Sequence, residues 1–170
     1  MDNEPTYSGK GTAPPEFIIQ RAVLDVLTAQ ACATYPDECC GMVIVRGGRE
    51  EAVPVANIQD QLHAADPAQF PRTARNAYTM GPEAGPVLIA AERGALQLRA
   101  FYHSHPDHDA YFSEEDRRQA LGAWDEPGYP DAAHIVVSVR NREVGTIAVF
   151  AWNAAWRDFV QVPLTVVESC

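Results

Sequence analysis

The chain has 170 residues, of which 46% are hydrophobic, and its formal net charge is −10. A chain of this size can bury a hydrophobic core as one domain. Its acidic balance argues against nucleic acid as a partner and against anionic membrane surfaces, because both attract basic proteins.

The N-terminal segment predicts neither a membrane span nor a secretion signal. No stretch approaches the roughly 20 apolar residues of a span, and the first residues lack a basic-then-apolar pattern. We therefore expect a cytoplasmic protein. Residues 1–15 are polar and contain several Gly and Pro residues, which predicts a disordered or loosely docked arm before a single domain at residues 16–170.

The start of the domain predicts a helix followed by a pair of strands. Apolar residues at helical period predict a helix over residues 17–33, which Tyr35-Pro36 ends. The apolar run 40–45 predicts a central strand. After a Gly-Gly turn, residues 51–57 predict a second strand that returns beside it.

The middle of the chain is less regular. Residues 58–75 lack periodicity and contain two prolines, so we expect a long loop beside the functional site, with His63 as an exposed loop residue. Residues 76–80 predict a short strand. Residues 83–93 predict a helix, because Pro is tolerated near a helix start and a Gly follows the end.

The second half predicts strands around one helix. Residues 97–102 are an apolar strand, and residues 114–121 are the helix. Three further strands are expected at residues 135–139, 144–152 and 156–162, the last of them ending the fold.

Two histidines lie at the end of the 97–102 strand. His103 and His105 are at i and i+2, so their side chains point to the same face. Pro106 then ends the strand, because it cannot donate to a sheet. Two imidazoles on one face can bind a single metal ion.

A carboxylate follows at the next helix. Ser113-Glu-Glu-Asp116 predicts a capping box, which places Asp116 in the first helical turn. Two imidazoles and one carboxylate around Zn²⁺ leave one tetrahedral position open, which is typical of a catalytic site. His108 is a weaker ligand candidate, and His134 is expected to be structural.

The spacing His103-Ser104-His105, seven residues, Ser113, two residues, Asp116 resembles the JAMM motif of the MPN-domain metalloproteases. The family also has an upstream glutamate, which Glu38 matches by its place before an apolar strand. The resemblance implies the MPN α/β fold of the cytidine-deaminase-like superfamily, a mixed sheet flanked by helices. It also implies one zinc ion per chain.

Each residue of the motif has an expected role. Glu38 is the candidate that takes a proton from water and delivers it to the leaving nitrogen. The serine that Ser113 matches stabilises an oxyanion in the resembling family. Ser104 points away from the metal by strand alternation, so we expect it to support the site from behind.

The substrate class follows from the resemblance alone. The chain is most similar to small bacterial peptidases that act on sulfur carriers, which implies hydrolysis after the Gly-Gly terminus of a small ubiquitin-like protein, as in a carrier–cysteine adduct. Alternatives are an isopeptidase that removes a ubiquitin-like modifier from lysine, a non-catalytic MPN scaffold, and a cysteine-dependent hydrolase. For the last, Cys39 and Cys40 are the candidates, although reduced buried thiols are expected.

Overall fold

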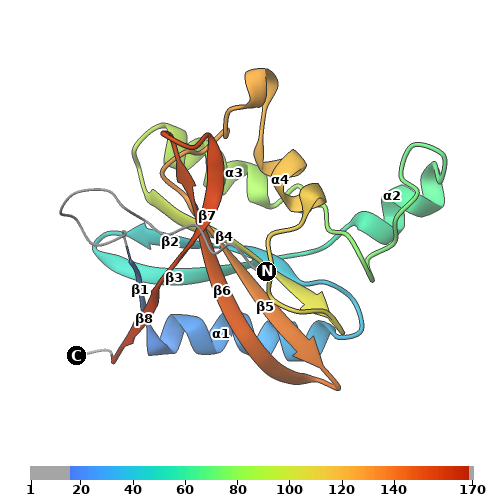
Figure 1. The fold of residues 1–170 in the computed structure, drawn as a ribbon, viewed down its shortest axis with the longest axis horizontal. Helices are drawn as coiled ribbons and strands as arrows, with labels where there is room; N and C mark the ends of the chain where they lie inside the picture. The colour runs from blue at the N-terminus through green and yellow to red at the C-terminus, as the bar shows by residue number, and fades with distance from the viewer. Residues whose placement is uncertain (1–15, 169–170) are drawn as a thin grey trace, which may run out of the picture.

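A computed structural model describes residues 16–168, so the expected arm at residues 1–15 lies outside the described part. Figure 1 shows its strands and helices coloured in chain order. In order they are β1 (Phe17–Gln20), α1 (Arg21–Thr34), β2 (Cys40–Arg46), β3 (Arg49–Val55), α2 (Gln59–Ala65), α3 (Ala84–Glu92), β4 (Gln97–Pro106), α4 (Glu114–Ala120), η1 (Ala123–Asp125), β5 (Ala133–Arg140), β6 (Glu143–Asn153), β7 (Asp158–Val162) and β8 (Leu164–Val167).

The main sheet is mixed, as expected from the sequence. Its six strands have the order β3-β2-β4-β5-β6-β7. The β4–β5 pair is parallel, and its other pairs are antiparallel. Strand β4 therefore lies inside the sheet, hydrogen-bonded on both sides, which fixes the direction in which its side chains point.

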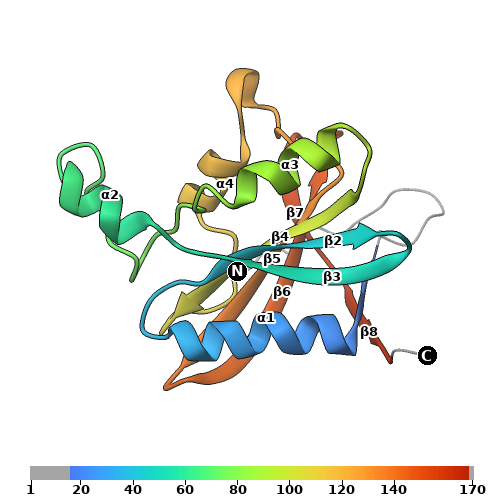
Figure 2. The same ribbon diagram turned by 180° about the vertical axis from the view of Figure 1, so that it is seen from behind.

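Helices cover both faces of this sheet. Helix α1 lies under one face, and α3 and α4 lie over the other (Figures 1 and 2). Side chains alternate between the faces accordingly. Val43 packs in the α1 cluster with Leu27, while its neighbours Met42 and Ile44 pack in the α3 cluster with Ala84.

The first element differs from the expectation. Residues 17–20 form strand β1, and the predicted helix begins only at Arg21. Strand β1 pairs in parallel with β8 as a separate two-stranded sheet. This partner lies at the other end of the chain, so no local pattern could indicate it.

Three further expectations need correction. The predicted loop at residues 58–75 contains helix α2, whose only buried residue is Gln59, so it has no apolar periodicity to detect. The predicted strand at residues 76–80 is reduced to one isolated bridge between Asn57 and Met80. The final segment is two strands, β7 and β8, and not one.

Gly41 matters for the pairing of β2 with β4. It lies opposite Tyr102, which is fully buried and donates its hydroxyl to Gln30 Oε1 at 2.6 Å. A Cβ atom added at Gly41 would lie 2.3 Å from the Tyr102 ring. The absence of a side chain here is therefore a packing requirement.

We expect Gly41→Ala to destabilise the fold by about 1–3 kcal/mol, because the new methyl group overlaps a buried ring that cannot move away. The matched control is Gly85→Ala in α3, where an added Cβ meets nothing within 4 Å. The control should stabilise by up to about 1 kcal/mol, since Ala is the better helix former. Urea unfolding measures both, and equal stability of the two variants would contradict the packing argument.

Candidate metal centre

The end of β4 and the start of α4 bring three potential metal ligands together. The Nε2 atoms of His103 and His105 lie 3.1 Å apart. The Asp116 carboxylate lies 3.1 Å from His103 Nε2 through one oxygen and 3.4 Å from His105 Nε2 through the other. All three residues are buried, and each offers a ligand atom within 4.8 Å of the others.

This spacing fits a metal ion. Zinc binds imidazole nitrogen and carboxylate oxygen at about 2.0–2.2 Å, so the ligand atoms of a tetrahedral site lie about 3.3 Å apart. The observed separations of 3.1 to 3.4 Å between the ligand atoms are close to that distance. The cluster can therefore hold a metal ion, and its donor set is one that suits zinc.

The loop after β4 orients His105. Its Nδ1 lies 2.9 Å from the backbone oxygen of Asp109, which can only accept, so Nδ1 carries a proton. Its Nε2 faces Asp116 and is the atom that a metal would bind in place of a proton. The loop is itself held by β5. Ser138 donates to the His108 carbonyl at 2.6 Å, and Arg140 pairs with the Asp109 carboxylate at 2.8 Å.

His103 is held by packing. Its ring is fully buried and stacks on Tyr78, with centroids 4.8 Å apart. Its Nδ1 has no hydrogen-bond partner within residues 16–168. Burial lowers the pKa of His103, so this imidazole stays neutral, the form that a metal ligand needs.

Asp116 has two roles in the same first helical turn. The predicted capping box is present, with Asp116 N donating to Ser113 Oγ at 3.0 Å and Ser113 N donating to the Asp116 carboxylate at 2.9 Å. Burial alone raises the pKa of Asp116, but the hydrogen bonds from His103 and His105 outweigh it, and the net shift is downward. The carboxylate is therefore ionised at neutral pH.

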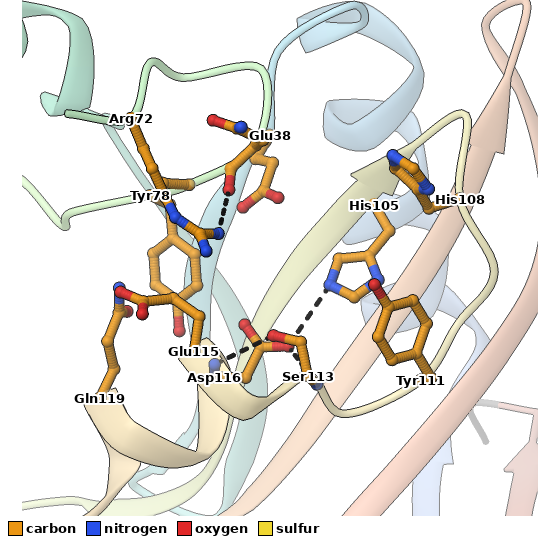
Figure 3. Close-up of a pocket in the computed structure, with 12 residues that line it drawn as sticks. Glu38, Arg72, Tyr78, His105, His108, Tyr111, Ser113, Glu115, Asp116 and Gln119 are labelled. Atoms are coloured by element: carbon orange, nitrogen blue, oxygen red, sulfur yellow. Dashed lines mark hydrogen bonds and ion pairs between the residues drawn. The ribbon is translucent and has the colours of Figure 1, made fainter.

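Glu38 lies in the same pocket but outside the three-residue cluster (Figure 3). Only 7% of it is exposed, and burial raises its pKa to about 8. Ser104 is on the opposite side of β4, where its Oγ accepts from Cys39 N at 2.8 Å. This bond ties the segment that carries Glu38 to the strand that carries the histidines.

The pocket has a volume of about 180 Å³. Besides the expected residues, its lining includes several that no sequence motif indicates, Arg72 and Tyr78 among them. Arg72 comes from the aperiodic stretch at residues 58–75, where no motif singles it out. His108 also lines the pocket without joining the cluster. His63 is not the exposed loop residue expected, because it lies half-buried in helix α2, with its Nδ1 at 2.7 Å from Phe70 O.

His134 and the cysteines Cys39 and Cys40 are buried in the core, outside the pocket. His134 is buried among Phe101, Phe112 and Phe159, and burial lowers its pKa to about 3. Burial also raises the pKa of the Cys39 thiol to about 11 and that of Cys40 to about 12. Because the thiolate is the nucleophilic form, this argues against the cysteine-dependent hydrolase.

The fold and the buried cluster define an α/β domain with a candidate metal site at the end of a central strand. Residues 20–157 match Prok-JAB, the prokaryotic homologs of the JAB domain, and the chain belongs to this family. The expected MPN-type fold is therefore confirmed. Within residues 16–168, none of the helices has the length and apolar character that a membrane crossing requires.

Solved structures share the fold at low sequence identity. A protein from Desulfitobacterium hafniense has a TM-score of 0.62 and 18% identity, over 89% of this chain and 93% of that chain. A protein from Salinibacter ruber has a TM-score of 0.53 and 20% identity, over 88% of this chain and 90% of that chain. A JAB1/MPN domain protein from Archaeoglobus fulgidus has a TM-score of 0.50 and 17% identity, over 89% of this chain and 100% of that chain.

One curated relative is a phage protein. The chain is 29% identical over 101 residues to the tail tip assembly protein K of Escherichia phage N15. The match covers 59% of this chain but only 35% of the phage protein, so the chain spans about a third of that relative.

The cluster predicts how metal binding responds to mutation. His105→Ala should lose most bound zinc, because only two ligands remain. His108→Ala is the matched control and should keep it, since His108 lines the pocket but lies outside the cluster. Both variants are loaded with zinc, dialysed to remove unbound metal, and their zinc content is measured by elemental analysis. Full zinc occupancy in His105→Ala would show that His105 is not a ligand.

The raised pKa of Glu38 predicts that the stability of the metal-free protein depends on pH. This pKa is raised from 4.5 to about 8, so the folded state holds this proton more tightly than the unfolded state. The free energy of unfolding should therefore fall as pH rises from about 4.5 to about 8. Glu38→Gln cannot ionise, so its stability advantage over wild type should grow by about 1–4 kcal/mol between pH 5 and pH 8.

The control for this prediction is Glu115→Gln at the same pocket. Its hydrogen bond to Arg118 lowers the pKa of Glu115, so removing the charge should bring no such gain at pH 8. Thermal unfolding in EDTA measures both variants. A constant difference between Glu38→Gln and wild type across this pH range would contradict the assigned shift.

Proposed function

We propose that this protein is a zinc-dependent peptidase that hydrolyses the amide bond after the C-terminal Gly-Gly of a small ubiquitin-like or sulfur-carrier protein, such as a carrier–cysteine adduct. The observation that carries the proposal is the buried cluster of His103, His105 and Asp116 in one pocket with Glu38. Membership of the JAB-domain family supports the peptidase chemistry. A zinc ion held by three protein ligands supplies Lewis acidity and lowers the pKa of water from about 15.7 to near 7.

Glu38 moves the proton in this proposal. A general acid–base group works best when its pKa is near the working pH, and burial raises the pKa of Glu38 above its ordinary value of 4.5. Its carboxylate takes a proton from the attacking water and gives it to the leaving nitrogen. Ser104 contributes indirectly, because its hydrogen bond to Cys39 N holds the chain next to Glu38.

Ser113 stabilises the oxyanion. Its Oγ already accepts a hydrogen bond from Asp116 N, and a hydroxyl that accepts one bond still has its own proton to donate. The residue is half-buried and lines the pocket, so this donor faces the reacting group. Such donors are worth about 10²–10³-fold in rate.

The size of the pocket supports a Gly-Gly terminus. The pocket of about 180 Å³ is lined by large side chains such as Arg72, Tyr78 and Tyr111, so residues without side chains are the easiest to place beside the scissile bond. Two glycines present only backbone there. A folded carrier would remain outside and reach the pocket through its flexible tail.

Two alternatives remain from the sequence reasoning. An isopeptidase would remove a ubiquitin-like modifier from lysine with the same residues, and a scaffold would use the domain only to bind. The similarity to a phage tail tip assembly protein adds a second candidate role, the processing of a protein during particle assembly. Zinc content together with chelator-sensitive hydrolysis separates the peptidases from a scaffold.

Glu38→Gln tests the role of the carboxylate. The variant should keep its zinc and lose about 10²–10⁴-fold in kcat, because the proton transfer fails while the ligands stay. Intact mass measurement on a carrier–cysteine adduct and on a lysine-linked conjugate gives the rates, with Glu115→Gln as the pocket control. If zinc is lost along with activity, Glu38 is a ligand and the assigned role is wrong.

A further inference from the structure

One cation faces the candidate site. Among the described residues that line the pocket, Arg72 is the only Lys or Arg, while Glu38, Glu115 and Asp116 are acidic. Its guanidinium projects toward the pocket from the loop after α2, on the side where Glu38 also lies (Figure 3). Arg72, Glu38 and Glu115 therefore line one and the same pocket.

The backbone around Arg72 is held firmly. The Arg72 carbonyl accepts from Gln59 Nε2 at 2.9 Å, and Gln59 is buried at the start of α2. Two residues further on, Ala74 N donates to the Asp60 carboxylate at 2.7 Å. The first turn of α2 therefore fixes the position from which Arg72 reaches the pocket.

The guanidinium keeps most of its hydrogen-bonding capacity. Arg72 Nη1 donates to the Asn76 carbonyl at 3.3 Å, and within residues 16–168 its guanidinium forms no ion pair with a carboxylate. A guanidinium has five N–H donors in a planar fork, which matches a carboxylate group. Arg72 is thus anchored and still able to bind an anion.

The reaction determines where an anion would lie. Water adds its oxygen to the carbonyl carbon of the terminal glycine, the C–N bond breaks, and the nitrogen leaves with the proton from Glu38. In an α-amino acid the carboxylate is attached to the carbon next to that nitrogen. A nitrogen at Glu38 therefore brings the carboxylate to the neighbourhood of Arg72. A lysine side chain has no carboxylate near its leaving nitrogen.

We propose that Arg72 binds the free α-carboxylate of the leaving amino acid, so that the substrate is a Gly-Gly terminus carrying one amino acid and not a lysine conjugate. This inference rests on the proposed peptidase function and narrows its substrate class. Arg72 acts on the substrate directly, as a specificity residue. Through Arg72, residues 58–75 would contribute to substrate binding.

The experiment compares three short synthetic peptides. One ends in Gly-Gly-Ala with a free carboxylate, the second is its C-terminal amide, and the third carries Gly-Gly on a lysine side chain. Hydrolysis is measured with the zinc-loaded wild type, Arg72→Gln, Arg72→Lys and Arg75→Gln. Binding of the first two is measured by calorimetry with zinc-loaded Glu38→Gln protein, with and without Arg72→Gln. Arg75 is the matched control, since it is exposed in the same loop but does not line the pocket.

The free acid should be preferred over the amide by about 10-fold or more in wild type and in Arg75→Gln, in both kcat/KM and affinity. Arg72→Gln should bring this ratio to about 1, and Arg72→Lys should keep part of it. An acid-to-amide ratio of 1 in wild type, or binding of neither peptide, overturns the proposal. A ratio that Arg72→Gln leaves intact also overturns it, because Arg72 would then act only through Glu38. A preference in binding without any hydrolysis would instead refute the peptidase function while the carboxylate site stands.

Discussion

The site depends on the hydrogen bonds that join residues 39–40 to residues 103–104. Cys40 pairs with His103 in the β2–β4 ladder, Ser104 N donates to Cys39 O, and Ser104 Oγ accepts from Cys39 N. Because these bonds are buried between strands, they fix the position of Glu38 relative to the two histidines. Every chemical role assigned to the pocket requires that relative position.

The centre concentrates groups that oppose folding. An acidic residue with a raised pKa, an ionised carboxylate and two close imidazoles share one buried region, and the Nδ1 of His103 has no partner within residues 16–168. Buried polar groups of this kind usually cost stability unless something pairs with them. A cation coordinated by the Nε2 atoms and Asp116 would offset part of this cost. The arrangement is therefore typical of a site maintained for function.

Local patterns were sufficient to predict the metal cluster, and long-range contacts were not visible. The His-x-His pair and the Ser-x-x-Asp cap each depend on the geometry of one element, so sequence spacing alone indicates which residues cluster. Glu38 was connected to them only through the family resemblance, because the β2–β4 pairing that brings it near spans more than 60 residues. Arg72 has no signal in the sequence, since its position depends on hydrogen bonds that Gln59 and Asp60 make to the backbone of residues 72 and 74. Residues 17–20 are predicted as helix but form strand β1 for the same reason, because the partner strand β8 is distant in the chain.

The pairing of β1 with β8 has a consequence for handling the protein. Helix α1 has 14 residues, about 21 Å at 1.5 Å per residue, and it separates β1 from the segment that carries Glu38. Strands β1 and β8, the first and last of the described chain, therefore lie side by side at the opposite end of α1 from the pocket (Figure 1). A fluorophore or surface tether attached on β1 or β8 would leave the pocket open to a large substrate. The same geometry would let the domain be inserted into a loop of another protein, since its entry and exit strands are adjacent.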